Sequence, residues 1–305
     1  QNGVNVASTA GATVTVADGN YAENVTINKS NLTLLSENGR DATTITGQVS
    51  GPGNGAVYVN TGSNNLKLGG DGKGFTIVGF DSASAGLEKA AVYIGGSNSG
   101  STIEGNRITA AGEAGLLTDY AGTLSNLIIT GNIFDGVTFV QPTAGNGEQF
   151  TAANVPRSLL YISGGSGGAN KTNIEFSHNE VVGTAGGFDV GGAESGNALV
   201  TIDAAGATIT DNNFAGTTTK WADALRVRGS NTTISGNSFD GSNMTASTYL
   251  LEAKAGSLSS TFADVAVNNT WKNAAWVDQL VGGSNYVFRS VQSAVSSAVA
   301  GDTVN

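Results

Sequence analysis

The chain has 305 residues, a net charge of −10 and no cysteine. The missing cysteines exclude disulfides and thiolate metal sites, and the acidic balance disfavours binding to nucleic acid or to an anionic membrane surface. Its 45 glycines stand against 3 prolines, and its 12% of charged residues is about half the usual share, as expected for a turn-rich stack of short strands. The composition predicts no metal site, no cofactor and no segment that inserts into a membrane.

The first strands are expected near the N-terminus. From Ala12 to Leu34 the sequence reads ATVTVADGNYAENVTINKSNLTL, in which apolar residues alternate with polar ones over short stretches. Alternation with a period of two is typical of strands that bury one face. The region therefore predicts strands from its start, before any repeated phrase occurs.

A short phrase then recurs along the chain: an apolar residue, two small or polar residues, Asn, any residue, and a bulky apolar residue. The copies centre on Asn106, Asn132, Asn179, Asn212 and Asn237, with a degenerate copy at Asn269. Their spacings are 26, 47, 33, 25 and 32 residues. Repetition at such a period predicts a solenoid, in which each copy buries its apolar face against its neighbours.

Each Asn is expected at the break between two short strands, where its side chain tolerates the left-handed backbone region and bonds to nearby main-chain groups. Equivalent Asn residues on stacked coils are expected to form a ladder. The sequence thus predicts an all-β right-handed parallel β-helix with coils of roughly 22 to 30 residues. The 47-residue step contains either one extra coil or a long loop, for which Val137 to Asn154 is the candidate.

The strongest local candidate for a binding or catalytic site is the segment from Lys220 to Arg228, KWADALRVR. If Leu225 and Val227 point inward, Arg226 and Arg228 project from one outer face. Trp221 is then placed to stack on a sugar ring, with Asp223 as a base or ligand near Lys220. The alternative is a strand whose arginines pair with acidic residues on adjacent coils, with Trp221 as a packing residue.

One short amphipathic helix is expected near the C-terminus. Phe288, Val291, Val295, Ala298 and Val299 form a single apolar stripe at helical spacing, and Gly301 is placed to stop the helix. Residues 302–305 then begin a strand. The predicted division is a β-helix over 1–286 and, over 287–305, a helix and strand start that cap the solenoid or dock onto a neighbouring unit.

In these two terminal segments the chain resembles the family of pectate-lyase-like right-handed β-helices. Many members open with a helix of the form IQxAVxxAxxGDTV, followed directly by VxxGxYxENVxIxKSxLTL. Here the helix half lies at the C-terminus and the strand half at the N-terminus. The resemblance implies a β-helix whose end is capped by a helix. The WIDH, RxPxxR and DPH signatures of related lyases and epimerases are absent, so no catalytic residue is carried over.

Two functions follow from these observations. The first is a structural or adhesive extracellular protein, a rigid β-helical module that associates head to tail through Phe288, Val291, Val295, Val299 and Val304. The second is a polysaccharide-active enzyme or glycan-binding module of the lyase or tailspike type, centred on residues 220–228. An outer cleft with two carboxylates and an arginine about 5–10 Å apart would favour the second. The first is preferred, and no enzymatic activity is assigned.

Overall fold

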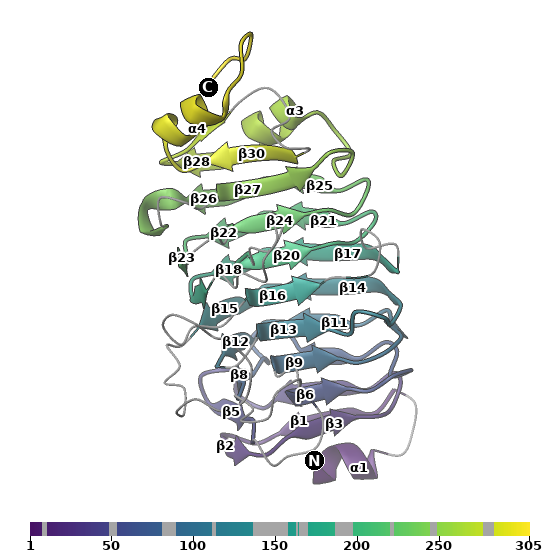
Figure 1. Ribbon diagram of the computed structural model, residues 1–305. Helices are drawn as coiled ribbons and strands as arrows, with labels where there is room; N and C mark the ends of the chain where they lie inside the picture. Colours follow the sequence, from purple (N-terminus) through teal and green to yellow (C-terminus); the bar gives the residue numbers. More distant parts are fainter. Residues whose placement is uncertain are drawn as a thin grey trace, which may run out of the picture.

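The structure is a computed structural model that describes residues 1–7, 11–48, 54–80, 90–111, 114–136, 158–162, 164, 170–186, 198–219, 223–244, 249–276 and 284–305. Three sheets run the length of the molecule and each coil contributes one strand to each sheet in turn (Figure 1). The N-terminus lies at one end of the stack and the C-terminus at the other.

The three sheets, here called A, B and C, contain most of the described strands. Sheet A stacks β1 (Thr13–Val16), β4 (Thr33–Ser36), β7 (Lys67–Gly69), β11 (Thr102–Glu104), β14 (Leu124–Thr130), β17 (Lys171–Ser177), β21 (Thr208–Thr210) and β25 (Thr233–Ser235), with β10 (Asn98–Ser99) beside β14. Sheet B stacks β2 (Gly19–Ala22), β5 (Thr43–Thr46), β8 (Thr76–Val78), β12 (Arg107–Ala110), β15 (Ile133–Gly136), β18 (Glu180–Val181), β22 (Asn213–Phe214), β26 (Ser238–Asp240) and β28 (Thr270–Lys272). Sheet C stacks β3 (Val25–Ile27), β6 (Gly55–Val59), β9 (Ala90–Ile94), β13 (Ala114–Thr118), β16 (Ser158–Ile162), β20 (Val200–Ile202), β24 (Leu225–Val227), β27 (Tyr249–Lys254), β30 (Ser284–Phe288) and β29 (Ala275–Trp276).

The remaining described elements are short. A small pair joins β19 (Thr184–Gly186) to β23 (Thr217–Thr219), and the helical elements are α1 (Asn2–Val6), η1 (Gly241–Asn243), α3 (Phe262–Val267) and α4 (Val291–Ser297). Strand pairing is parallel throughout sheets A and B, as between β14 and β17, and in sheet C up to β27. The expected fold, a right-handed parallel β-helix, is confirmed. Among the described residues, no helix has the length and apolar character needed to cross a membrane.

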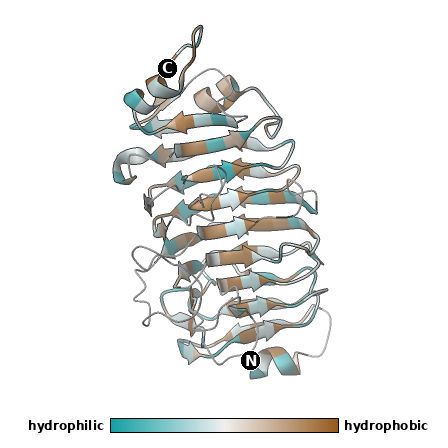
Figure 2. Ribbon diagram, in the orientation of Figure 1, coloured by the Kyte–Doolittle hydropathy of each residue, from teal (hydrophilic) through white to brown (hydrophobic). Residues whose placement is uncertain are grey.

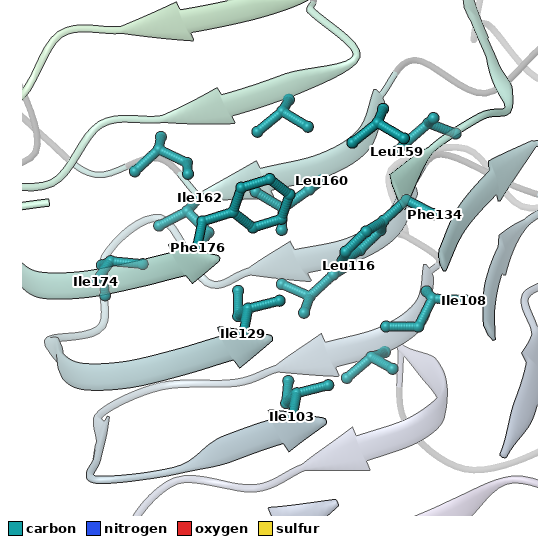
Figure 3. Packing of buried hydrophobic residues seen from close by; sticks show 14 of the residues in the cluster. Ile103, Ile108, Leu116, Ile129, Phe134, Leu159, Leu160, Ile162, Ile174 and Phe176 are labelled. Atoms are coloured by element: carbon teal, nitrogen blue, oxygen red, sulfur yellow. The ribbon is translucent and has the colours of Figure 1, made fainter. Parts of the chain in front are cut away.

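The core fills the space between the three sheets. Ile129 and Phe176 of sheet A, Phe134 of sheet B and Leu116 and Leu160 of sheet C point toward one another and are fully buried (Figure 3). Hydrophobic and hydrophilic residues alternate along many of the strands (Figure 2), because successive side chains of a strand point to opposite faces. This explains why the apolar repeat could be recognised in the sequence.

The recurring Asn residues form the predicted ladder between sheets A and B. All but the degenerate copy at Asn269 are buried, and the amide nitrogen of each donates to the amide oxygen of the next: Asn132 Nδ2 to Asn179 Oδ1 at 3.1 Å, and Asn179 Nδ2 to Asn212 Oδ1 at 3.0 Å. The series runs from Asn106 through to Asn269. Each coil is thereby held in register with the next by side chains as well as by its strands.

The expectation that these Asn residues occupy the left-handed region is wrong. Except at Asn269, the residue before each one takes that conformation: Gly105 (φ 71°), Gly131 (φ 63°), His178 (φ 55°), Asp211 (φ 57°) and Gly236 (φ 71°). The left-handed residue bends the chain between the strand of sheet A and the next strand of sheet B. The Asn that follows the bend points into the core. The Asn side chain bonds to the neighbouring coils and also to its own turn, as where Asn132 Nδ2 donates to the Thr130 carbonyl at 3.0 Å.

The 47-residue step contains one coil and no extra one. The β14 strand pairs directly with β17, and Asn132 bonds directly to Asn179, so these coils are neighbours. The additional sequence is an insertion between β15 and β16. Its predicted loop, Val137 to Asn154, lies outside the described residues.

The C-terminal end departs from the parallel pattern. The strand β30 runs antiparallel between β27 and β29, and α3 lies where sheet A has no further strand (Figure 1). Trp271 stacks on Phe239 with ring centroids 4.4 Å apart, and its indole nitrogen donates to the Ala266 carbonyl of α3 at 2.8 Å. Trp271 thus covers the end of the core.

Candidate functional site

The strand β24 places an arginine on the outer face of sheet C. Leu225 and Val227 are fully buried in the core, as predicted, so Arg226 between them points outward. In the sheet register Arg226 lies between Thr201 of β20 and Glu252 of β27. The outer face of three successive coils therefore presents a hydroxyl, a guanidinium and a carboxylate in one row.

Asp223, Arg226 and Glu252, here called the acidic triad, form a compact charge cluster on this face. Arg226 Nε donates to Glu252 Oε2 at 2.6 Å, and Arg226 Nη2 lies 3.1 Å from Asp223 Oδ2. All three residues are buried, with Arg226 and Glu252 each 8% exposed and Asp223 1% exposed. This arrangement matches the alternative considered for the segment, in which an arginine pairs with an acidic residue on an adjacent coil.

Burial raises the pKa of the Asp223 carboxyl well above its usual range, and the carboxylate of Glu252 beside it acts in the same direction. The nearby Arg226 lowers that pKa without offsetting the loss of solvation, because its guanidinium is also bonded to Glu252. Asp223 therefore keeps its proton to a higher pH than a free aspartate. While it does so, its contact with Arg226 is a hydrogen bond to a neutral carboxyl group, and Arg226 and Glu252 balance each other's charge.

Aromatic residues border the acidic triad on the C-terminal side. Tyr249 and Tyr286 have ring centroids 4.4 Å apart, and Phe288 packs edge-on against Tyr249 at 5.2 Å. Burial, with the negative charge of Glu252, raises the pKa of Tyr286 to about 12, so its hydroxyl stays neutral. The site is thus flanked by phenol groups that remain hydrogen-bond donors.

The geometry does not meet the requirement set for a glycosidase-type pair. Arg226 Nε lies 3.2 Å from Asp223 Oδ2 and 2.6 Å from Glu252 Oε2, so the guanidinium occupies the space between the two carboxyl groups that such a pair keeps free for the substrate. What the acidic triad can do chemically is keep one carboxyl group, that of Asp223, protonated and hold the guanidinium fixed.

The structure brings together only part of the predicted site. Asp223 and Arg226 are in contact, and Arg228 is half-buried, one residue after the end of β24. Lys220 and Trp221 lie outside the described residues. Glu252 was missed, although its separation of 26 residues from Arg226 equals a coil step seen in the Asn repeat. That equality is the signal that could have found it.

The residues predicted to mediate assembly divide into two groups. Phe288 is buried in β30, while Val291, Val295 and Val299 are exposed by 64%, 51% and 67%. The helix α4 is shorter than the predicted stripe because the Ser290 hydroxyl caps it by accepting from the Ser293 amide at 3.1 Å. The helix also ends before Gly301.

The strand expected after this helix is only a short contact. Trp276 and Asn305 exchange two backbone hydrogen bonds of 3.0 and 2.9 Å, and Val304 packs on the cluster around Phe288. The exposed apolar surface at this end of the molecule is provided by these three valines and by Val267 of α3, which is 76% exposed.

Replacing Asp223 with asparagine should change how stability depends on pH. Between the pKa of a free aspartate, 3.8, and its raised value in the fold, the folded chain binds more protons than the unfolded chain. Asp223 therefore makes the free energy of unfolding fall as pH rises through this window, by up to about 1.4 kcal/mol per pH unit. The Asp223→Asn variant mimics the protonated carboxyl group and lacks this slope.

Urea unfolding of the wild type and of Asp223→Asn at a series of pH values measures the effect, and the difference between the two curves isolates this group from all other carboxylates. We expect the difference to shift in favour of the variant as pH rises. Two parallel curves would show that Asp223 titrates normally.

No protein-family model matches the chain, and no curated protein matches it. Among solved structures, the chain is similar to ORF18 of Geobacillus virus E2, with 18% identity, a TM-score of 0.49 and coverage of 79% of this chain and 46% of that one. It is similar to a pectin methylesterase from carrot, with 12% identity, a TM-score of 0.38 and coverage of 92% and 80%.

A third similar structure is tailspike gp49 of Acinetobacter baumannii bacteriophage Fri1, described as a capsular polysaccharide depolymerase, with 13% identity, a TM-score of 0.28 and coverage of 85% and 56%. The chain thus spans less than half of the viral ORF18 chain. These identities and TM-scores are too low to carry a residue role or a substrate to this chain.

Proposed function

We propose that the chain is a rigid structural module of an extracellular surface, used as one of several units joined end to end. The observation that carries this proposal is the way in which charged side chains are used. Lys67 pairs with Glu104 at 3.1 Å, and Asp240 with Lys272 at 2.7 Å, each between neighbouring coils. Arg107 with Asp135, and Arg226 with Glu252, also join one coil to the next.

These pairs run along the axis of the solenoid instead of converging on one place. Exposed pairs contribute little to stability individually, but each one neutralises charge within the stack and leaves fewer charges free to face a ligand. Together with the Asn ladder and the continuous core, these ion pairs hold neighbouring coils in fixed positions and make the solenoid rigid. A spacer or a scaffold at a cell surface needs such rigidity.

The second candidate function is binding or turnover of a polysaccharide at the outer face of sheet C. A specific observation favours it: the acidic triad combines two carboxyl groups and an arginine beside Tyr249 and Tyr286. Sugar-binding sites use this combination of hydrogen-bonding groups and aromatic rings. The burial of the acidic triad and the arginine bound to both of its carboxyl groups weigh against turnover.

One experiment decides between the two. The purified chain is incubated with neutral and acidic polysaccharides, and the release of reducing ends, of unsaturated products and of methanol is measured. For a structural module we expect none of these products with the wild type. Product formed by the wild type, lost in Glu252→Gln and Asp223→Asn and kept in Arg228→Met, would overturn the proposal in favour of the second candidate.

A further inference from the structure

The two ends of the chain contain the same local unit. The sequence Ala-Gly-Ala-Thr-Val at residues 10–14 recurs as Ala-Gly-Asp-Thr-Val at residues 300–304. In both places a short helix precedes the glycine, α1 at the N-terminus and α4 at the C-terminus. When the glycines are aligned, the five residues of α1 fall on positions within α4.

The equivalence extends to conformation and packing. Gly11 and Gly301 both have positive φ, 84° and 101°. Val4 of α1 and Ala294 of α4 occupy the same aligned position, and each is the buried residue of its helix, at 2% and 0% exposure. Each helix therefore packs on its own end of the solenoid through the face that contains this aligned position.

The outer faces of the two helices differ. In this alignment Val291 and Val295 of α4 correspond to Gln1 and Asn5 at α1, and Val299 corresponds to Thr9. The side chains of Gln1 and Asn5 bond to each other, with Nε2 to Oδ1 at 2.7 Å. Gln1 also exchanges hydrogen bonds with the Thr26 backbone of the first coil, whereas Val291 and Val295 of α4, and Val299 just after it, are exposed. An exposed apolar stripe of this kind marks a contact surface.

The opposite end of the solenoid has a recess whose lining is partly apolar and partly polar. A pocket of about 380 Å³ lies between α1 and the first coils, with Val14, Val16, Leu34 and Ile45 in its lining. Val14 and Val16 are only half-buried, whereas Leu34, one coil further in, is 2% exposed. The first coil is therefore incompletely covered by α1, and its apolar side chains are open to the end of the molecule.

We infer that the valine face of α4 binds this N-terminal pocket in a second copy of the chain. The two surfaces lie at opposite ends of one rigid stack (Figure 1), so the α4 helix of one molecule cannot reach the N-terminal pocket of the same molecule. A contact between two different surfaces does not close on itself, so it builds a linear head-to-tail assembly. This inference rests on the proposed structural function and names the contact through which its units join.

The test uses two variants of the full 305-residue chain. In the first, Val291→Gln, Val295→Asn and Val299→Thr give α4 the residues that the α1 unit carries at the aligned positions. In the second, Val16→Arg places a charge in the pocket. Thermal unfolding followed by circular dichroism confirms that both remain folded, and analytical ultracentrifugation over rising concentration measures association.

We expect the wild type to form a concentration-dependent series of oligomers, and each variant alone to associate about a hundredfold more weakly. Mixed together, the two variants should form a dimer and nothing larger, because the intact pocket of the first binds the intact α4 of the second. A wild type that stays monomeric overturns the inference, and so does a Val16→Arg variant that still dimerises through its valines. Neither result decides whether the chain is a structural module. The polysaccharide assay tests that proposal separately, because its outcome does not depend on assembly.

Discussion

Replacing Asn212 with alanine is expected to lower the free energy of unfolding by about 3–5 kcal/mol. Asn212 Oδ1 accepts from both the backbone nitrogen and the side-chain nitrogen of Asn179, at 2.9 and 3.0 Å. Its own amide nitrogen donates to the Phe176 carbonyl at 2.8 Å and to Asn237 Oδ1 at 2.9 Å. Alanine leaves these buried groups without partners where water cannot replace them, and each orphaned group costs about 1–3 kcal/mol.

The adjacent residue provides a matched control. Asn213 has the same side chain on the exposed face of the next strand, so Asn213→Ala should change stability by no more than about 0.5 kcal/mol. Urea unfolding of both variants gives the two values. Equal effects would show that the ladder does not contribute to stability beyond the strand pairing around it.

The second large effect is expected for Arg226→Met, which should cost about 3–5 kcal/mol at neutral pH. The methionine retains much of the side-chain volume, so packing is largely kept. The loss arises because the buried Glu252 carboxylate loses its charge-assisted hydrogen bond of 2.6 Å. Adding Glu252→Gln to this variant should recover part of the loss, because a neutral amide costs less to bury than an unpaired carboxylate, and a packing defect would not be relieved in this way.

A triple variant separates the effect of the uncompensated charge on stability from the effect of changed packing at the site. Asp223→Asn, Arg226→Met and Glu252→Gln together remove every charge of the acidic triad, so the variant should be more stable than Arg226→Met alone. Arg228→Met, one residue after the end of β24, is the control for general effects of losing an arginine. If the triple variant were the least stable of the three, the uncompensated charge of Glu252 would not be the cause.

The architecture was accessible from the sequence because the coils from Asn106 onward carry the same Asn phrase. The Asn spacing located the break between strands, and the alternation around Ile129 or Ile209 indicated which side chains face the core. The position of the left-handed residue was not accessible, because Gly105 and His178 share no side-chain chemistry that would mark the turn. Only the backbone geometry shows that the residue before each Asn makes the reversal.

The contacts of the candidate site were less accessible, because they depend on which coils are neighbours. Arg226 was identified, but its partner Glu252 belongs to another coil. Lys171 is a similar case: it is fully buried, and its ammonium group donates to the carbonyls of Asp119, Tyr120 and Gly122, which lie one coil away. No sequence pattern marks a buried lysine of this kind, because its three carbonyl partners are backbone groups of a neighbouring coil.

The hydrogen bonds between coils have a mechanical consequence. They run along the solenoid axis, so tension applied to the two ends stretches them directly, one coil at a time, instead of shearing many at once. A coil occupies about 4.8 Å of the axis when folded. A repeat of 25 residues, such as that from Asn212 to Asn237, extends to about 85 Å when its strands detach. Under tension the coils are therefore expected to unfold one after another. Each unfolding coil lengthens the chain and absorbs mechanical work.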